Sequence, residues 1–300
     1  MYWYIGIMTG GTLIIKLWIW PIAIKQIGFY KAKMSEIVRH IRPMLILFIP
    51  VLATSVFTFM DKIMIQSIGH DINAVGIYEY SEKIVKLPLG IITAVGAVML
   101  PRISNLLANK HDEKTKQYFD MTMKYLGLLV IAMAFGIAAI APVFSVVFYG
   151  AEFYQCGPMI TVLSAILITG AWADIIRTQY LIPSFNDKIY SIAVITGAIV
   201  NFMLNYIMIP KYGAFGAAIA TIVAELALCA IHTAGVWNVL KVKKYILYWG
   251  EYAVIGAVMF IIVRIIGNML GISIFTLLVQ IVVGISVYAV LSILLLLVKK

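Results

Sequence analysis

Charged residues are scarce in this sequence. Asp, Glu, Lys and Arg make up 12% of the 300 residues, and 63% of the residues are hydrophobic. The mean hydropathy of the chain is +1.01, whereas a soluble domain carries about 25% charged residues. The composition excludes an ordinary soluble domain and predicts an all-α polytopic membrane protein.

Cysteine and the common catalytic motifs are also scarce or missing. The two cysteines, Cys156 and Cys229, stand in or beside apolar runs and form no C-x-x-C spacing, which argues against a zinc site or a disulfide framework. The sequence holds no glycine-rich phosphate loop and no nucleophile elbow. We therefore expect no ATP hydrolysis, no cofactor and no enzymatic activity.

The few charges are mostly positive. Lys and Arg number 23 against 13 Asp and Glu, a formal net charge of +10. Most of these cations lie between apolar runs, where they set the orientation of a chain in a bilayer. The basic balance therefore indicates a membrane protein and does not indicate a nucleic-acid partner.

Apolar runs of about 20 residues are long enough to cross a bilayer as helices. The sequence predicts about nine of them, at 4–23, 43–67, 84–107, 122–149, 157–183, 189–209, 213–238, 246–270 and 273–298. The connections between them alternate between basic and weakly charged. This alternation predicts an N-terminus outside, a C-terminus inside and a basic cytoplasmic linker up to residue 42. We also expect upstream helices to be missing from the chain.

The stretch 205–225, NYIMIPKYGAFGAAIATIVAE, contains a sharp break. Pro210 removes a backbone donor and Gly213 permits a tight reversal, so we expect two antiparallel helices. Small residues follow at three- and four-residue spacing, which allows close helix packing in lipid. Glu225 then lies in an apolar run, where it is either neutral and hydrogen-bonded or lines a polar pathway.

The resemblance to a known family rests on four stretches that occur in the same order. They are LFIPVLATSVFTFMDKIMIQSIG (47–69), VGIYEYSEKIVKLPLGIITAVGAVMLPRISNLLA (75–108), TQYLIPSFNDKIY (178–190) and GAIVNFMLNYIMIPKYGAFGAAIATIVAE (197–225). This pattern resembles bacterial polysaccharide flippases, which export O-antigen or capsule repeat units and belong to the multidrug/oligosaccharidyl-lipid/polysaccharide exporter superfamily. Such flippases have two six-helix lobes facing a central cavity.

The resemblance implies a division of the chain. Residues 1–42 would hold the last helix of a first lobe and the basic linker, 43–240 the second six-helix lobe, and 241–300 two trailing transmembrane helices. The implied activity is to move an oligosaccharide repeat unit, linked to polyprenyl pyrophosphate, across the bacterial cytoplasmic membrane. The implied partners are that lipid-linked oligosaccharide, membrane lipid, a missing N-terminal lobe and a polysaccharide polymerase.

Six charged residues are candidates for the substrate cavity: Asp61, Lys62, Lys83, Asp174, Arg177 and Glu225. Asp61 and Lys62 match the Asp-Lys pair of the resembling family, and Lys83 matches its EKI lysine. Each has a simpler interpretation as well. Asp61 and Lys62 can pair with each other, and Lys83 and Arg177 can pair with acids one helical turn away.

Aromatic residues are further candidates, for stacking on sugars, but they also anchor helices at membrane interfaces. They are Tyr78, Tyr80, Trp172 and Tyr180.

Other functions remain open on the sequence alone. Within the superfamily, the chain could be a peptidoglycan-precursor flippase or a cation-coupled drug exporter. Outside it, a polytopic membrane enzyme acting on lipid-linked sugars and a non-transporting remnant that packs against a partner both fit the composition.

Overall fold

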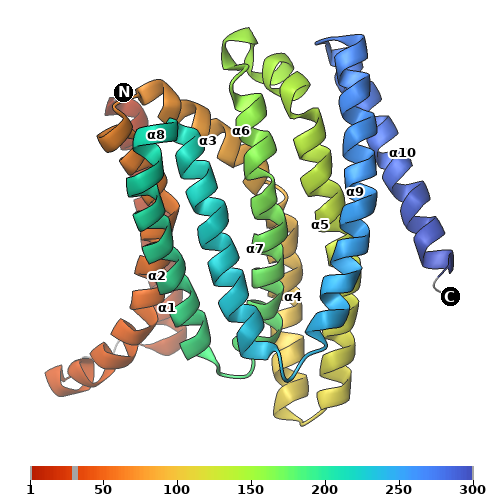
Figure 1. Ribbon diagram of the computed structural model, residues 1–300. Helices are drawn as coiled ribbons and strands as arrows, with labels where there is room; N and C mark the ends of the chain where they lie inside the picture. Colours follow the sequence, from red (N-terminus) through yellow and green to blue (C-terminus); the bar gives the residue numbers. More distant parts are fainter. Residues whose placement is uncertain (1, 29–32, 299–300) are drawn as a thin grey trace. The chain divides into compact units, whose positions relative to one another are not determined.

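The computed structural model describes residues 2–28 and 33–298, and every regular element in these ranges is helical. The chain divides into two compact units, Met1–Phe48 and Ile49–Lys300, here called unit 1 and unit 2. Figure 1 gives the helix labels. The all-α class expected from composition is confirmed.

Unit 1 contains helix α1 (Tyr2–Ile27) and the first part of α2 (Met34–Gly69), a helix that contributes residues to both units. Of the expected basic linker 24–42, the start continues α1 and the end begins α2. Residues 29–32 lie outside the described part of the chain.

Unit 2 holds the rest of α2 and the elements that follow it. They are α3 (Ile72–Lys86), α4 (Leu89–Ala108), α5 (Asp112–Tyr149), η1 (Ala151–Phe153), α6 (Cys156–Leu163), α7 (Ala165–Ile176), the π-helical segment η2 (Arg177–Leu181), α8 (Asp187–Val236), α9 (Val242–Leu270) and α10 (Ile274–Val298).

Seven helical segments within the described residues are long and apolar enough to cross a membrane. The chain is therefore a multi-pass membrane protein, but the expected number of nine spans is not confirmed. Two differences account for this. The helix α2 is not among the seven segments, and α8 counts once although it contains two of the expected spans.

The helix α8 reverses direction at Gly213, whose φ is 57°. The two halves then run antiparallel, because a Cβ at Gly197 would contact Leu228, and a Cβ at Gly216 would clash with the backbone carbonyl of Met208. The reversal and the close packing of small residues predicted from 205–225 are thus confirmed. Figure 1 shows the two halves side by side.

The core of unit 2 is apolar, with aromatic groups between α5, α7 and α9. The rings of Trp172 and Trp249 meet edge to face at 5.0 Å between centroids. The indole nitrogen of Trp249 donates to the backbone oxygen of Met123 (2.9 Å). A buried indole N–H needs such a partner, so this bond ties α9 to α5.

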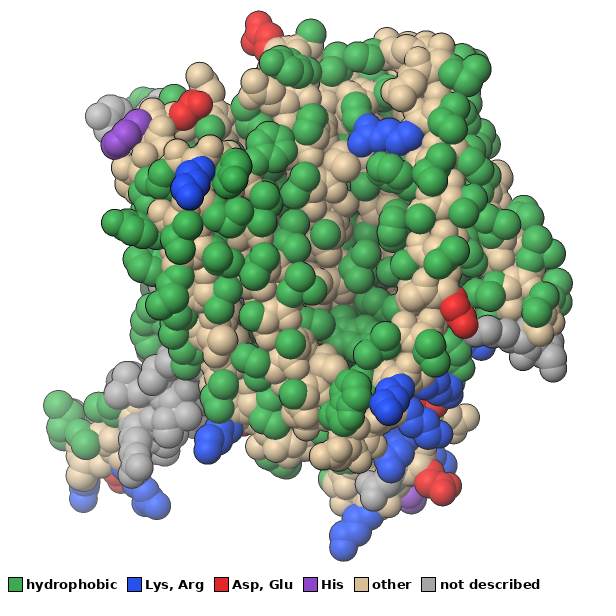
Figure 2. Space-filling view, in the orientation of Figure 1, with side chains coloured by type: hydrophobic (Ala, Val, Ile, Leu, Met, Phe, Trp, Pro, Cys, Tyr) green, Lys and Arg blue, Asp and Glu red, His purple; other side chains and the backbone are tan. Residues whose placement is uncertain are grey.

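The connections of unit 2 lie at two opposite ends, and α8 reverses at Gly213 between the α7–α8 and α8–α9 connections (Figure 1). In Figure 1, the α4–α5, α7–α8 and α8–α9 connections lie at the lower end, and the α5–α6 and α9–α10 connections lie at the upper end. Figure 2 shows Lys and Arg side chains gathered at the lower end and hydrophobic side chains over the middle. The structure thus brings the basic connections to one end, and the side of the membrane that this end faces stays a prediction.

Candidate functional site

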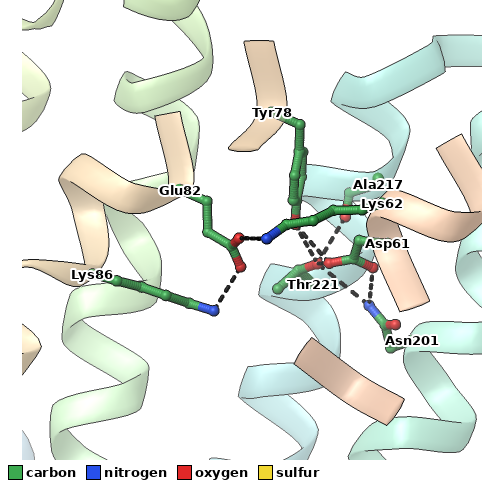
Figure 3. A network of polar contacts seen from close by, with 8 residues as sticks. All are labelled: Asp61, Lys62, Tyr78, Glu82, Lys86, Asn201, Ala217 and Thr221. Carbon is green, nitrogen blue, oxygen red and sulfur yellow. Dashed lines mark hydrogen bonds and ion pairs between the residues drawn. The ribbon is translucent and has the colours of Figure 1, made fainter. Parts of the chain in front are cut away.

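The carboxylate of Asp61 lies at the centre of a buried polar network (Figure 3). Asp61 is on α2 and is 2% exposed. Its Oδ2 accepts hydrogen bonds from the hydroxyls of Tyr78 and Thr221, both at 2.6 Å. Its Oδ1 accepts from the side-chain amides of Asn201 (3.0 Å) and Asn205 (2.6 Å). Four donors therefore replace the water that an ionised carboxylate loses on burial.

The α8 hairpin explains how these donors converge. Asn201 and Asn205 are one helical turn apart on the first half of α8, so their side chains share a face. The reversal at Gly213 returns the second half alongside the first, which brings Thr221 next to Asn201, with Nδ2 and Oγ1 3.3 Å apart. Neighbours in the folded network are thus 20 residues apart in the sequence.

The Asp61 network is rich in oxygen, the ligand that hard cations prefer. The Oδ1 of Asn205 is buried and has no hydrogen-bond partner among the described residues. Asp61, Asn205 and Thr221 are therefore the residues that would hold a small monovalent cation, which would neutralise the carboxylate. The described ranges contain no group of three or more His, Cys, Asp or Glu side chains that could hold a metal ion.

Lys62 follows Asp61 in the sequence but belongs to another cluster. Its Nζ lies 3.0 Å from Oε2 of Glu82, and the Nζ of Lys86 lies 2.6 Å from Oε1 of the same carboxylate. We call Lys62, Glu82 and Lys86 the lysine cluster. Glu82 is nearly buried, whereas the two lysine side chains are 20% and 42% exposed. The cluster carries a net charge of +1, and both cations keep access to a ligand.

Lys83 lies apart from this cluster. It pairs with Glu79 at 2.8 Å, and both side chains are exposed. The hydrogen bond from Lys83 holds the pKa of the Glu79 carboxyl below its ordinary value, and the same bond raises the pKa of Lys83. The pairing one turn apart that the sequence indicated for Lys83 is present, and Glu82–Lys86 shows the same spacing.

Asp174, Arg177 and Glu225 line a separate cavity of about 310 Å³ between α7, η2 and both halves of α8. Arg177 donates to Oδ1 of Asp174, as their spacing indicated, and its guanidinium lies 5.7 Å from the ring centroid of Tyr190. His232 also lines this cavity. We call it the Glu225 cavity.

Glu225 itself makes no hydrogen bond or ion pair with the part of the chain that the structure describes. The six candidate residues therefore fall into four groups instead of one: Asp61 in its network, Lys62 in the lysine cluster, Lys83 with Glu79, and the other three at the Glu225 cavity.

The four aromatic candidates all contact other parts of the protein. Tyr78 is fully buried and donates to Asp61, and the indole nitrogen of Trp172 donates to the hydroxyl of Thr233 (2.9 Å). Tyr180 packs against the core. Tyr80 is 42% exposed and contacts the ring of Tyr149, so it is the most accessible of the four.

Sequence reasoning did not select Asn201, Asn205 and Thr221, nor the role of Glu82 as the shared partner of two lysines. A signal for the first three was present. Asn201 and Asn205 are uncharged polar residues spaced one turn apart in an apolar run, and such residues bond to neighbouring helices in membranes. Glu82 gave no comparable signal, because its second partner, Lys62, lies on another helix.

Comparison with known proteins gives the family. A family model described as lipid II flippase MurJ matches residues 2–288. The chain belongs to this family. The match covers both units and supports the wider superfamily that the resemblance indicated.

Curated relatives of this MurJ family chain are named as flippases and transporters. A putative O-antigen transporter of Shigella dysenteriae is 24% identical over 181 residues, which cover 60% of this chain and 44% of the relative. The lipid II flippase MurJ of Bacillus subtilis is 24% identical over 222 residues, covering 69% of this chain and 38% of the relative. The chain thus spans less than half the length of these relatives.

The fold also matches a solved MurJ structure. A lipid II flippase MurJ in an inward closed conformation superposes with a TM-score of 0.74 at 18% identity, covering 88% of this chain and 56% of that one. The similarity shows a MurJ-like fold.

Proposed function

We propose that the protein moves a lipid-linked glycan precursor, carried on a polyprenyl diphosphate, across the cytoplasmic membrane. The observation that carries this proposal is the lysine cluster in a chain of the MurJ family. Lys62 and Lys86 share one carboxylate, so they are incompletely neutralised. An apolar helical bundle has little reason to keep such a positive group unless it meets an anion.

A diphosphate fits the lysine cluster better than Glu82 does. It brings more negative charge and more acceptor oxygens than one carboxylate, and lysine binds phosphate as a compact point charge. When a diphosphate reaches Lys62 and Lys86, it competes with Glu82 for them. This exchange lowers the desolvation cost of taking the anion across hydrocarbon.

The sugar portion admits two candidates. The O-antigen transporter relative supports an oligosaccharide repeat unit of a surface polysaccharide. The family model and the Bacillus subtilis relative support a peptidoglycan precursor. Both are polyprenyl diphosphates, so the lysine cluster serves either of them equally.

The proposal includes two helical bodies that rock about the substrate, as alternating access requires. The lobe expected at residues 43–240 is one such body. The opposing lobe belongs to the same protein or to a partner, and a polysaccharide polymerase would receive a flipped repeat unit. A cation-coupled drug exporter is less favoured because the lysine cluster suits an anion, and the relatives' names support a transporter that is not an enzyme.

The test is a flipping assay in proteoliposomes with the complete protein. Fluorescent polyprenyl diphosphates bearing a repeat-unit oligosaccharide or a peptidoglycan-type head group are placed in both leaflets, and a membrane-impermeant quencher reports their exchange. We expect exchange with one head group, and a loss of about tenfold or more in Lys62→Ala and Lys86→Ala, the value of one charge-assisted hydrogen bond.

The matched control is Lys211→Ala, because Lys211 is an exposed cation at the α8 reversal. Exchange should be unchanged in this variant. Equal rates in K62A, K86A and K211A would remove the lysine cluster from the mechanism, and absence of exchange with both lipids would reject the flippase activity.

A further inference from the structure

The Glu225 cavity contains titratable groups that the proposed contact with a diphosphate does not use. Five of its lining residues are polar or charged: Asp174, Arg177, Tyr190, Glu225 and His232. Asp174 and Arg177 neutralise each other. The remaining charge is that of the Glu225 carboxylate, which is costly in a low-dielectric interior without a partner.

His232 supplies a base that faces the same space. The residue is 1% exposed, and its Nδ1 lies 3.3 Å from the backbone oxygen of Ala173. A carbonyl oxygen only accepts, so Nδ1 carries the hydrogen, and in the neutral ring Nε2 then holds a lone pair. That Nε2 is buried and has no hydrogen-bond partner among the residues described. The backbone thus fixes the tautomer that leaves a free proton acceptor.

Glu225 and His232 are close enough to act through water. They are seven residues apart on one helix, which places them on the same face with about 10 Å between them along the axis. A cavity of about 310 Å³ has room for about ten water molecules at their liquid volume. A short chain of waters can therefore join the carboxylate to the imidazole.

The ligand set favours a proton over a metal cation. Hard cations such as Na⁺ take several oxygen ligands, whereas one side of this cavity presents a nitrogen lone pair beside the guanidinium of Arg177. A proton needs only one acceptor. Chains of Glu and His inside membrane proteins commonly carry protons.

The neighbouring elements add further titratable groups. Asp174 and Arg177 face His232 from α7 and η2, and Tyr190 faces it from the first half of α8, 6.1 Å away between ring centroids. Lys86 of α3 and Cys229 of α8 interact electrostatically with Glu225. Lys86 is already paired with Glu82, so its charge offsets that of Glu225 only in part.

We propose that the Glu225 cavity is a proton-binding site, in which one proton from the surrounding water is held by Glu225 and His232 through bridging water. Protonation of Glu225 turns its carboxylate into a neutral acid, and protonation of His232 balances the carboxylate with an imidazolium. Thr221, which donates to Asp61, lies one helical turn from Glu225 on α8. The proton site and the Asp61 network therefore share one helix face.

The test observes the proton on His232 directly. The chain has four histidines, so the variant H40Q/H70N/H111N of the complete protein leaves His232 as the only histidine within this sequence. Nitrogen-15 labelling of histidine and NMR in lipid bilayers then report both ring nitrogens as the pH is changed. We expect a neutral ring with hydrogen on Nδ1 at high pH, and hydrogen on both nitrogens at low pH.

Coupling to Glu225 is tested by adding Glu225→Gln to the same background. Loss of a negative charge about 10 Å away should move the midpoint of the His232 titration about one pH unit lower. Glu79→Gln is the matched control, because Glu79 is an exposed acid paired with Lys83, and it should leave the midpoint unchanged.

Three results would overturn the proposal. They are a neutral ring with hydrogen on Nε2, a midpoint of the His232 titration that Glu225→Gln leaves unchanged, and ring-nitrogen signals that change with the NaCl concentration at fixed pH but not with pH. The tautomer is measured without altering the cavity, so the proposal can be rejected even if the Gln variant folds poorly. The experiment requires no transport, and failure of the proposed flippase activity would leave its outcome unaffected.

Discussion

Asp61 and Glu225 are acids in the same helical unit, and their surroundings are opposite. Asp61 accepts hydrogen bonds from four side chains on α3 and α8. Glu225 faces a cavity and has no hydrogen bond or ion pair with the residues that the structure describes. A fixed set of donors stabilises charge permanently, whereas a cavity lets the charge change. The first arrangement fits a structural role, in which the carboxylate holds helices together. The second fits a carboxyl group that gains and loses a proton.

The largest expected effect comes from removing the Asp61 carboxylate. Asp61→Ala leaves four buried donors without their acceptor, so the free energy of unfolding should fall by about 3–5 kcal/mol. Reversible unfolding in mixed detergent micelles measures the change. Asp61→Asn keeps one acceptor oxygen and should lose clearly less. Equal stability of D61A and the unaltered protein would show that the four donors find other partners.

A smaller effect is expected from disturbing the hairpin that brings the donors together. A Cβ at Gly216 would clash with the backbone carbonyl of Met208, so Gly216→Ala should destabilise the protein by about 1–3 kcal/mol. Thermal unfolding followed by circular dichroism reports the loss.

Gly250→Ala is the matched control for the hairpin variant. A Cβ at Gly250, within α9, would meet nothing within 4 Å, and alanine is the better helix former by up to about 1 kcal/mol. Stability should therefore stay the same or rise. A loss as large as that of G216A would mean that any added methyl group in this bundle is harmful.

The smallest effect is expected at Glu225. Glu225→Gln breaks no hydrogen bond with the described residues and removes a charge from an apolar setting, so the free energy of unfolding should change by no more than about 0.5 kcal/mol. Chemical unfolding in detergent, run beside D61A, gives the comparison. A loss above about 2 kcal/mol would indicate that Glu225 is held as tightly as Asp61, and the contrast between the two acids would fail.

Much of the fold follows from local patterns in the sequence. Apolar length predicts the long helices, and Pro210 with Gly213 predicts the reversal within α8. The number of spans was less predictable, because α2 is not among the apolar segments and α8 contains two expected spans in one helix. Boundaries also shifted, since the expected span 84–107 begins later, at Leu89. A hydropathy pattern does not determine where one helix ends and an adjoining helix begins.

The site was predictable only where partners lie one turn apart. Asp174 with Arg177 and Glu79 with Lys83 are pairs that spacing alone suggests. For Lys62, the sequence offered a pair with its neighbour Asp61 as the simpler interpretation, and Lys62 instead contacts Glu82. Side chains at adjacent helix positions point about 100° apart, so they rarely meet. Their partners depend on how α2, α3 and α8 pack, which sequence spacing does not encode.

The reversal at Gly213 also bears on how the chain enters the bilayer. The turn leaves almost no loop between the two halves of α8, and only Lys211 in it is charged. Little polar material has to be carried across the membrane when the second half follows the first. The two halves should therefore partition into lipid together during synthesis, with their small-residue faces already in contact, and the Asn and Thr side chains never exposed singly to hydrocarbon.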